Sequence, residues 1–321
     1  MAASSSKLFA VPMLFATALM CAGAAALLAG TTPHARAEAQ SSKAPAHIVS
    51  VGGAVTETLF ALGLGERVKA VDTTSMYPAA AMKLPKVGYL RQLSAEGVLA
   101  MRPDLVLLGE GAGPAAAVTQ IKSANVPVAD IATSWTPDGI AGMVETVGDA
   151  VGERAAADKL AADVTVQFAA LAAGIPTTSK PTILLLLNAG TGPMLGAGKG
   201  TAAEAAILLA GGQLALPTLE GYRPLSLEPV MAADPDFIVI PSHVVQALGG
   251  PDALGSIDVI SHTNAGRDGR IIIADSLYLL GFGPRTPQAI ADLAEIIHPD
   301  ADIPLAGRSS TPSGLVRLVG N

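Results

Sequence analysis

Two stretches of alternating strand-like and helix-like segments flank nearly forty residues that carry no strand signal. In that middle stretch, residues 136–173, apolar side chains recur at helical spacing, as at Met143, Val147 and Val151. A helix over residues 153–172 would extend roughly 30 Å at the usual rise per residue. The pattern therefore predicts two similar α/β units joined by a stiff helical connection.

Short apolar runs bounded by Gly, Pro or Asp predict the strands, and amphipathic runs between them predict the helices. We expect strands at 47–51, 68–71, 105–108, 126–128, 182–187, 236–240 and 271–274. We expect helices at 56–64, 93–100, 120–124, 201–209, 227–232 and 287–297. Continuous apolar strands in this order indicate mostly parallel sheets covered on both faces by helices.

An internal repeat supports two lobes, because residues 100–106 (AMRPDLV) and 232–238 (AADPDFI) occupy corresponding places in the two halves. The predicted fold class is α/β, with a mostly parallel central sheet in each lobe and a long rigid linker helix. The expected divisions are a leader, a first lobe, a linker, a second lobe and a tail, at 1–37, 38–136, 137–175, 176–303 and 304–321.

The first 37 residues have the features of a secretory signal peptide. Lys7 precedes a long apolar stretch, and small residues flank Arg36 in the sequence Ala35-Arg36-Ala37. A retained membrane anchor is the alternative, because the apolar stretch approaches the length that spans a bilayer. We expect export to the periplasm with cleavage near Ala37, or alternatively after Ala39.

The single cysteine, Cys21, lies inside this leader, and its surroundings match a lipoprotein site poorly. The mature chain would therefore contain no disulfide and no thiolate metal site. Cleavage would remove Lys7 and Arg36, two of the 20 basic residues, and none of the 27 acidic ones, so the net charge would change from −7 to −9. An acidic chain without a basic stripe argues against nucleic acid as a partner.

Several segments resemble the helix-linked class of periplasmic binding proteins (class III) that serve vitamin B12, ferric siderophore and haem importers. They are 49–63 (VSVGGAVTETLFALG), 87–97 (VGYLRQLSAEG), 195–204 (LGAGKGTAAE), 221–226 (GYRPLS) and 280–287 (LGFGPRTP). The resemblance covers about residues 46–298. The segments at 87–97 and 281–285 are similar to those of haem-binding members, so the resemblance implies capture of ferric haem in the cleft between the lobes.

Within the segment at 87–97, the resemblance implies that Tyr89 ligates the haem iron. A phenolate is a hard anionic oxygen donor that suits ferric iron. Arg91 lies two residues on, and an extended backbone would direct it to the same face as Tyr89. A guanidinium there would favour the charged phenolate. A loop tyrosine packed at the surface and a solvated arginine are the structural alternatives.

His243 follows a predicted strand, at the carboxyl edge where ligands of such sheets bind. It stands where relatives commonly carry an arginine, and it would either ligate the iron or pair with a haem propionate. Some relatives have a histidine where this chain has Asn188. Tyr222, Arg223 and Arg285 are candidate haem contacts, each with a purely structural role as the alternative.

The resemblance also implies that one acid in each lobe registers the protein on the permease, and Glu57 and Glu204 occupy matched helices. The expected partners are haem and an inner-membrane ABC permease, with an outer-membrane haem receptor acting upstream, and we expect a monomer. A corrinoid or a ferric siderophore is the alternative ligand.

An exported α/β enzyme is the remote alternative, and it lacks sequence support. There is no Gly-x-Ser-x-Gly motif, and no Ser/His/acid set stands out. The glycine-rich segment around Lys199 lacks the Ser or Thr that a phosphate-binding loop needs after its lysine. The remaining histidines, His47, His262 and His298, have no zinc-type spacing. We therefore expect no catalytic activity.

Overall fold

The computed structural model describes residues 44–188, 193–304 and 314–318. The predicted leader, Cys21, most of the predicted tail and the glycines at 190 and 192 lie outside these residues. Among the described residues, no helix has both the length and the apolar character required to cross a bilayer.

The first lobe is built on a four-stranded parallel sheet with the order β2-β1-β5-β6. Its strands are β1 (Ile48–Val51), β2 (Val68–Val71), β5 (Leu105–Gly109) and β6 (Val128–Ile131). Helices α1 (Gly53–Ala61), α2 (Ala79–Met82), α3 (Ala95–Ala100) and α4 (Ala115–Ser123) belong to the same lobe, with the short helix η1 (Gly65–Arg67). Buried strand residues pack on both faces of the sheet, which explains why the strands are continuously apolar.

The second lobe contains a seven-stranded mixed sheet with the order β10-β8-β7-β11-β12-β13, in which β9 also pairs with β7. Its parallel centre is β9 (Gln213–Leu214), β7 (Thr182–Asn188), β11 (Phe237–Pro241) and β12 (Ile271–Ala274). Three antiparallel strands extend it, β8 (Leu195–Ala197), β10 (Tyr222–Pro224) and β13 (Leu315–Leu318). Strand β13 lies in the predicted C-terminal tail, so part of that segment completes the sheet.

The helices of the second lobe are more numerous than the sequence predicted. They are α7 (Ala202–Leu209), α8 (Leu227–Ala233), α9 (Ser242–Ala247), α10 (Asp258–Ser261), α11 (Asn264–Arg267), α12 (Ser276–Leu280) and α13 (Thr286–Ile297), with the short helix η2 (Pro251–Ser256). In this lobe the ends of the helices predicted at 201–209, 227–232 and 287–297 agree with the structure to within one residue, whereas α9 to α12 are too short to show a helical period. In the first lobe the helices predicted at 56–64 and 120–124 begin earlier, at Gly53 and Ala115.

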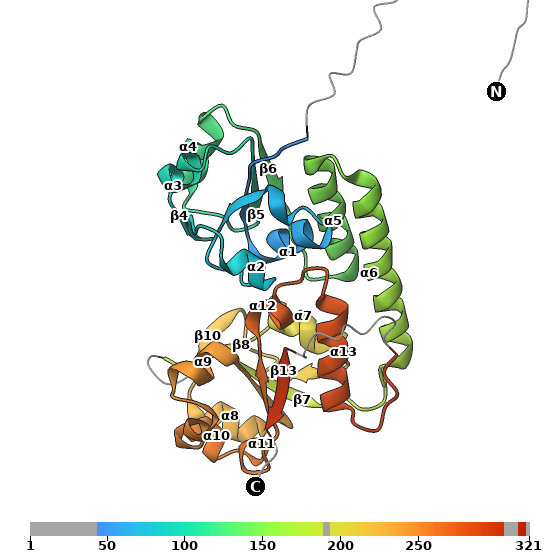
Figure 1. Cartoon of the computed structure of the whole chain (residues 1–321). Coiled ribbons are helices and arrows are strands. Elements are labelled where there is room, and N and C mark those ends of the chain that lie inside the picture. The colour runs from blue at the N-terminus through green and yellow to red at the C-terminus, as the bar shows by residue number, and fades with distance from the viewer. Residues whose placement is uncertain (1–43, 189–192, 305–313, 319–321) are drawn as a thin grey trace, which may run out of the picture. The chain divides into compact units, whose positions relative to one another are not determined.

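The connection between the lobes consists of two helices, α5 (Pro137–Val151) and α6 (Arg154–Gly174), which lie side by side (Figure 1). Gly152 separates them in a left-handed conformation, with φ of 76°, that favours glycine. Helix α5 packs on α1 and β6 of the first lobe, and α6 packs on α13 of the second. With 21 residues, α6 extends about 32 Å, as the sequence predicted for a linker helix.

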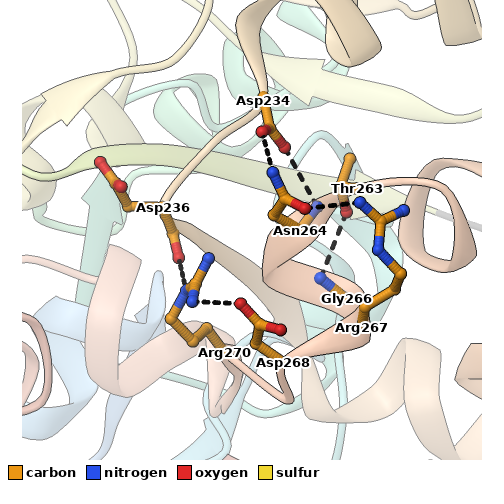
Figure 2. Close-up of polar contacts among 8 residues, drawn as sticks. All are labelled: Asp234, Asp236, Thr263, Asn264, Gly266, Arg267, Asp268 and Arg270. Atoms are coloured by element: carbon orange, nitrogen blue, oxygen red, sulfur yellow. Dashed lines mark hydrogen bonds and ion pairs between the residues drawn. The ribbon is translucent and has the colours of Figure 1, made fainter.

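A polar cluster fastens α11 to the turn that leads into β11 (Figure 2). Asp234 accepts hydrogen bonds from the backbone and side-chain nitrogens of Asn264, and Arg267 binds the Asn264 side-chain oxygen. Arg270 donates from Nε to the Asp236 carbonyl at 2.8 Å and pairs with Asp268. These contacts hold the entry to the central strand of the second lobe.

Candidate functional site

Tyr89 lies on a two-stranded antiparallel hairpin formed by β3 (Gly88–Tyr89) and β4 (Gln92–Leu93). Its side chain is 43% exposed. Gly88 has φ of 110°, and a Cβ there would stand 2.8 Å from the Gln92 carbonyl oxygen, so only glycine fits this position. The phenol is therefore exposed to solvent on a hairpin whose backbone conformation requires glycine at position 88.

Backbone hydrogen bonds hold this hairpin from two sides. The Thr73 N–H, just after β2, donates to the Gly88 carbonyl at 2.9 Å. The Gly113 N–H, in the loop after β5, donates to the Leu90 carbonyl at 2.9 Å, and its own carbonyl accepts from the Leu93 N–H at 2.7 Å. Both loops follow parallel strands, so Tyr89 is tied to the carboxyl edge of the sheet, where ligands of α/β sheets bind.

Arg91 occupies the turn of the hairpin, so the extended backbone that would align it with Tyr89 is not present. Its exposed side chain lies beside the loop after β5, where a Cβ on Gly111 would stand 3.8 Å from Arg91 Nη1. The structure thus places Arg91 at the turn of the hairpin, and the extended backbone on which the expected shared face depended is absent.

His243 lies in the first turn of α9, immediately after β11, and is exposed. Its Nδ1 is 3.3 Å from the Ser276 hydroxyl. Together with Asn188 at the end of β7, it lines a pocket of about 300 Å³ whose other walls are Leu187, Leu195, Val244, Ala247 and Leu248. The pocket offers a mostly apolar surface with two polar groups, the composition of a small-molecule site.

Tyr222 and Arg223 lie on β10, but they have different environments. Tyr222 packs against the main hydrophobic core, and burial raises the pKa of its phenol, an effect that hydrogen bonds with the Ala203 backbone and the Thr201 side chain partly offset. Arg223 is exposed and donates from Nε to the Glu220 carbonyl at 3.2 Å. Tyr222 is therefore engaged in packing, which is the structural role given as the alternative to a haem contact.

Glu57 and Arg285 contact each other instead of presenting free charges. The Glu57 carboxylate accepts from the Arg285 backbone N–H at 2.9 Å and from its Nη2 at 2.8 Å. Glu57 is only 4% exposed. The structure thus does not support Glu57 as a surface acid for docking, because its partner from the other half of the chain covers it.

Glu204 has a local structural contact. Its carboxylate accepts a hydrogen bond from the Gly200 N–H at 2.7 Å, while the Thr201 hydroxyl accepts from the Glu204 N–H at 3.1 Å. These contacts satisfy two backbone donors at the start of α7, in a variant of the capping box in which the carboxylate binds the N–H of the residue before the N-cap. The half-buried side chain is therefore committed to the helix end.

Two acids that were not among the residues predicted from the sequence are more exposed than Glu57 and Glu204. Glu96 and Glu228 are exposed, and each lies in the first turn of a helix, α3 and α8 respectively. Each follows a serine at the helix N-cap by two residues, Ser94 and Ser226. The internal repeat contained this signal, because Glu96 and Glu228 each lie four positions before the matched segments that begin at 100 and 232.

The sequence matches the family model described as "Periplasmic binding protein" over residues 48–278. The chain belongs to this family. Its members bind solutes for ABC-type importers, so this protein is a solute-binding protein that acts outside the cytoplasm.

Solved structures of periplasmic haem-binding proteins are similar to this one. The apo form of RhuT from Roseiflexus sp. RS-1 is 40% identical, with a TM-score of 0.75, over 79% of this chain and 98% of that one. BhuT in complex with two haems is 39% identical, with a TM-score of 0.72, over 78% and 97%. A periplasmic haem-binding protein from Pseudomonas aeruginosa is 34% identical, with a TM-score of 0.70, over 84% and 100%.

Curated relatives include proteins named for a different ligand. A vitamin B12-binding protein from Vibrio parahaemolyticus is 28% identical over 62% of this chain and 71% of its own length. YvrC of Bacillus subtilis, an ABC transporter substrate-binding lipoprotein, is 27% identical over 80% and 82%. The family is thus established, and both haem and corrinoid binders occur among the relatives.

Proposed function

We propose that the protein captures ferric haem and delivers it to an ABC-type permease. The observation that carries the proposal is Tyr89, an exposed phenol on a hairpin that three backbone hydrogen bonds tie to the carboxyl edge of the sheet. A fixed phenolate is a suitable axial ligand for ferric iron. A corrinoid such as cyanocobalamin carries its own axial ligands on cobalt and does not require this phenolate.

The second lobe supplies groups of matching chemistry. The pocket beside His243 is mostly apolar, as a porphyrin face requires, and an exposed imidazole there is able either to ligate iron or to bind a propionate. Asn188 in the same pocket is a hydrogen-bonding group and a poor iron ligand. Arg91 and Arg223, both exposed, are further candidates for the propionates.

Identity to the relatives favours haem over a corrinoid. The solved haem-binding proteins are 34% to 40% identical over nearly their whole lengths, whereas the Vibrio parahaemolyticus B12-binding relative is 28% identical. The leader and its removal near Ala37 remain part of the proposal, and the intact mass of the exported protein tests them.

Docking on the permease is proposed to use Glu96 and Glu228. Both carboxylates are exposed and lie at equivalent positions of the two lobes, so basic residues on the permease would contact one in each half. Glu57 lacks the exposure that this role needs, and Glu204 is turned toward the Gly200 N–H.

Parallel titrations of the purified protein with hemin and with cyanocobalamin test the ligand. We expect a saturable change in the Soret band with hemin and no saturable binding of cyanocobalamin at comparable concentrations. Saturable binding of cyanocobalamin without binding of hemin would replace the haem proposal with the corrinoid one.

A further inference from the structure

A second contact joins the two lobes in addition to the α5–α6 connection. Glu57 on α1 and Arg285, just before α13, are 228 positions apart in the sequence, yet both carboxylate oxygens of Glu57 accept hydrogen bonds from Arg285. The carboxylate is almost fully buried, and the arginine side chain is 24% exposed. The pair is therefore largely removed from solvent.

The backbones on either side of this pair approach each other closely. A Cβ on Gly53 would stand 2.4 Å from Leu277 Cδ1, and a Cβ on Gly283 would stand 3.0 Å from Glu57 Oε1. A larger residue at either position would have to displace a side chain of the opposite lobe, Leu277 or Glu57. The glycines thus permit the two lobes to meet at contact distance.

Aromatic rings of both lobes complete the contact. The Arg285 guanidinium carbon lies 3.3 Å from the centroid of the Tyr77 ring in the first lobe, and 5.1 Å from that of Tyr278 in the second. Stacking of a guanidinium on an aromatic face is favourable, more so where solvent is excluded. Arg285 is thus held by a carboxylate and by a ring of the opposite lobe at once.

A buried carboxylate fixes the loop that carries Tyr77. Asp72 is fully buried and accepts hydrogen bonds from the N–H groups of Gly52 and Thr74, both at 2.9 Å, and from the Ser75 hydroxyl at 2.7 Å. The same loop donates the Thr73 N–H to the hairpin of Tyr89. The loop after β2 therefore supports both the contact between the lobes and the hairpin that carries Tyr89.

We infer that the Glu57–Arg285–Tyr77 contact fixes the relative orientation of the two lobes before any ligand binds. Separating the lobes would break both hydrogen bonds to Glu57 and the stacking of Arg285 on Tyr77 at once. Removing either charged partner by mutation would leave the other group in the contact without its counter-charge, which is far more costly than the loss of an exposed ion pair. The inference does not depend on which ligand the protein takes, since none of the three residues needs to touch it.

Distance measurements between spin labels test this inference. One label is attached at Ala116→Cys in α4 and the other at Ala232→Cys in α8, both exposed positions, in a Cys21→Ser background that has no other cysteine. We expect a single narrow distance distribution in the parent without ligand. Glu57→Gln and Arg285→Gln should each add a second population of distances, and the double variant should add no more than either single one.

Glu153→Gln is the matched control, because it removes the charge from the Arg67–Glu153 pair, which is of similar length (2.9 Å against 2.8 Å), without involving the second lobe. If a Gln variant does not fold, Arg285→Lys takes its place in the same measurement. This variant keeps the charge and the backbone N–H but loses the planar stack. Parental distributions in the folded Glu57 and Arg285 variants, or the same broadening in Glu153→Gln, would overturn the inference.

Discussion

Asp104 and Asp236 make the same contact in the two halves of the chain. Asp104 accepts hydrogen bonds from the N–H groups of Ala46 and His47, just before β1. Asp236 accepts from the N–H and hydroxyl of Thr182, where β7 begins. Each aspartate thus links the entry of one strand to the start of a neighbouring strand, which explains why the Pro-Asp dipeptide recurs in the internal repeat.

The contact at Asp104 predicts a pH-dependent contribution to stability. Burial alone would raise the pKa of this carboxyl, but the N–H groups of Ala46 and His47 outweigh it and lower the pKa below its ordinary 3.8. Asp104→Asn should reduce the free energy of unfolding by about 1 kcal/mol at neutral pH. Because the folded-state pKa is depressed, the contribution is complete above pH 3.8 and is lost as the pH falls below that value.

Denaturant unfolding of the parent and Asp104→Asn between pH 7 and pH 3 measures the difference. Asp163→Asn, at an exposed position on α6, serves as the control and should behave like the parent at every pH. A difference between parent and Asp104→Asn that stays constant down to pH 3 would contradict this origin.

Tyr89→Phe should remove the phenolate and leave the rest of the ring in place. We expect loss of the tyrosinate charge-transfer band of the hemin complex and a fall in hemin affinity on the order of tenfold or more, equal to at least about 1.4 kcal/mol. Absorption titrations measure both. Tyr222→Phe, at a tyrosine engaged in the core, should keep the parental spectrum; an unaltered spectrum in Tyr89→Phe would remove the ligand assignment.

Arg91→Ala should weaken hemin binding severalfold and make the complex more sensitive to low pH. Arg91 forms the turn of the Tyr89 hairpin, and its guanidinium lies beside Gly111. In the hemin complex, a positive charge close to an iron-bound phenolate would stabilise that anion. A spectroscopic pH titration of the hemin complex is the measurement, with Arg223→Ala as the comparison. Equal midpoints in Arg91→Ala and the parent would count against the role.

His243→Ala should change the spin state of the bound iron if the imidazole completes the coordination. Opposite a phenolate, the imidazole would give six-coordinate, low-spin ferric iron, and its removal would give a high-spin signal. Electron paramagnetic resonance of the two hemin complexes distinguishes these states. Identical spectra would assign His243 to a propionate or to the pocket wall, where it stands 3.3 Å from the Ser276 hydroxyl.

Reversal of charge at Glu96 and Glu228 should impair delivery without affecting capture. Both side chains are exposed and lie on α3 and α8, outside the Tyr89 hairpin and the His243 helix, so hemin titrations of Glu96→Lys/Glu228→Lys should match the parent. Uptake of hemin by the permease reconstituted in vesicles should fall at least tenfold. Glu66→Lys/Glu220→Lys, at other acidic positions of the two lobes, is the control, and full transport by the docking variant would refute the assignment.

The sequence by itself determined the central strands, the long helices and the two-lobed arrangement. Runs such as β5 and β12 are apolar because both faces of a parallel sheet are covered, and this pattern is visible without knowledge of their partners. The helical connection between the lobes was predicted from the spacing of apolar residues such as Met143, Val147 and Val151. The family segment around Tyr89 likewise needed no tertiary information.

Only the tertiary structure decided which polar side chains are exposed and free to contact a ligand or a partner protein. Short strands such as β8 and β13 exist because a neighbouring strand supplies their hydrogen bonds, so local pattern does not reveal them. Glu57 resembles any exposed helix acid until Arg285, 228 positions away, is brought against it. Local pattern is set by residues a few positions apart, whereas burial and charge pairing depend on contacts that form only when the chain has folded.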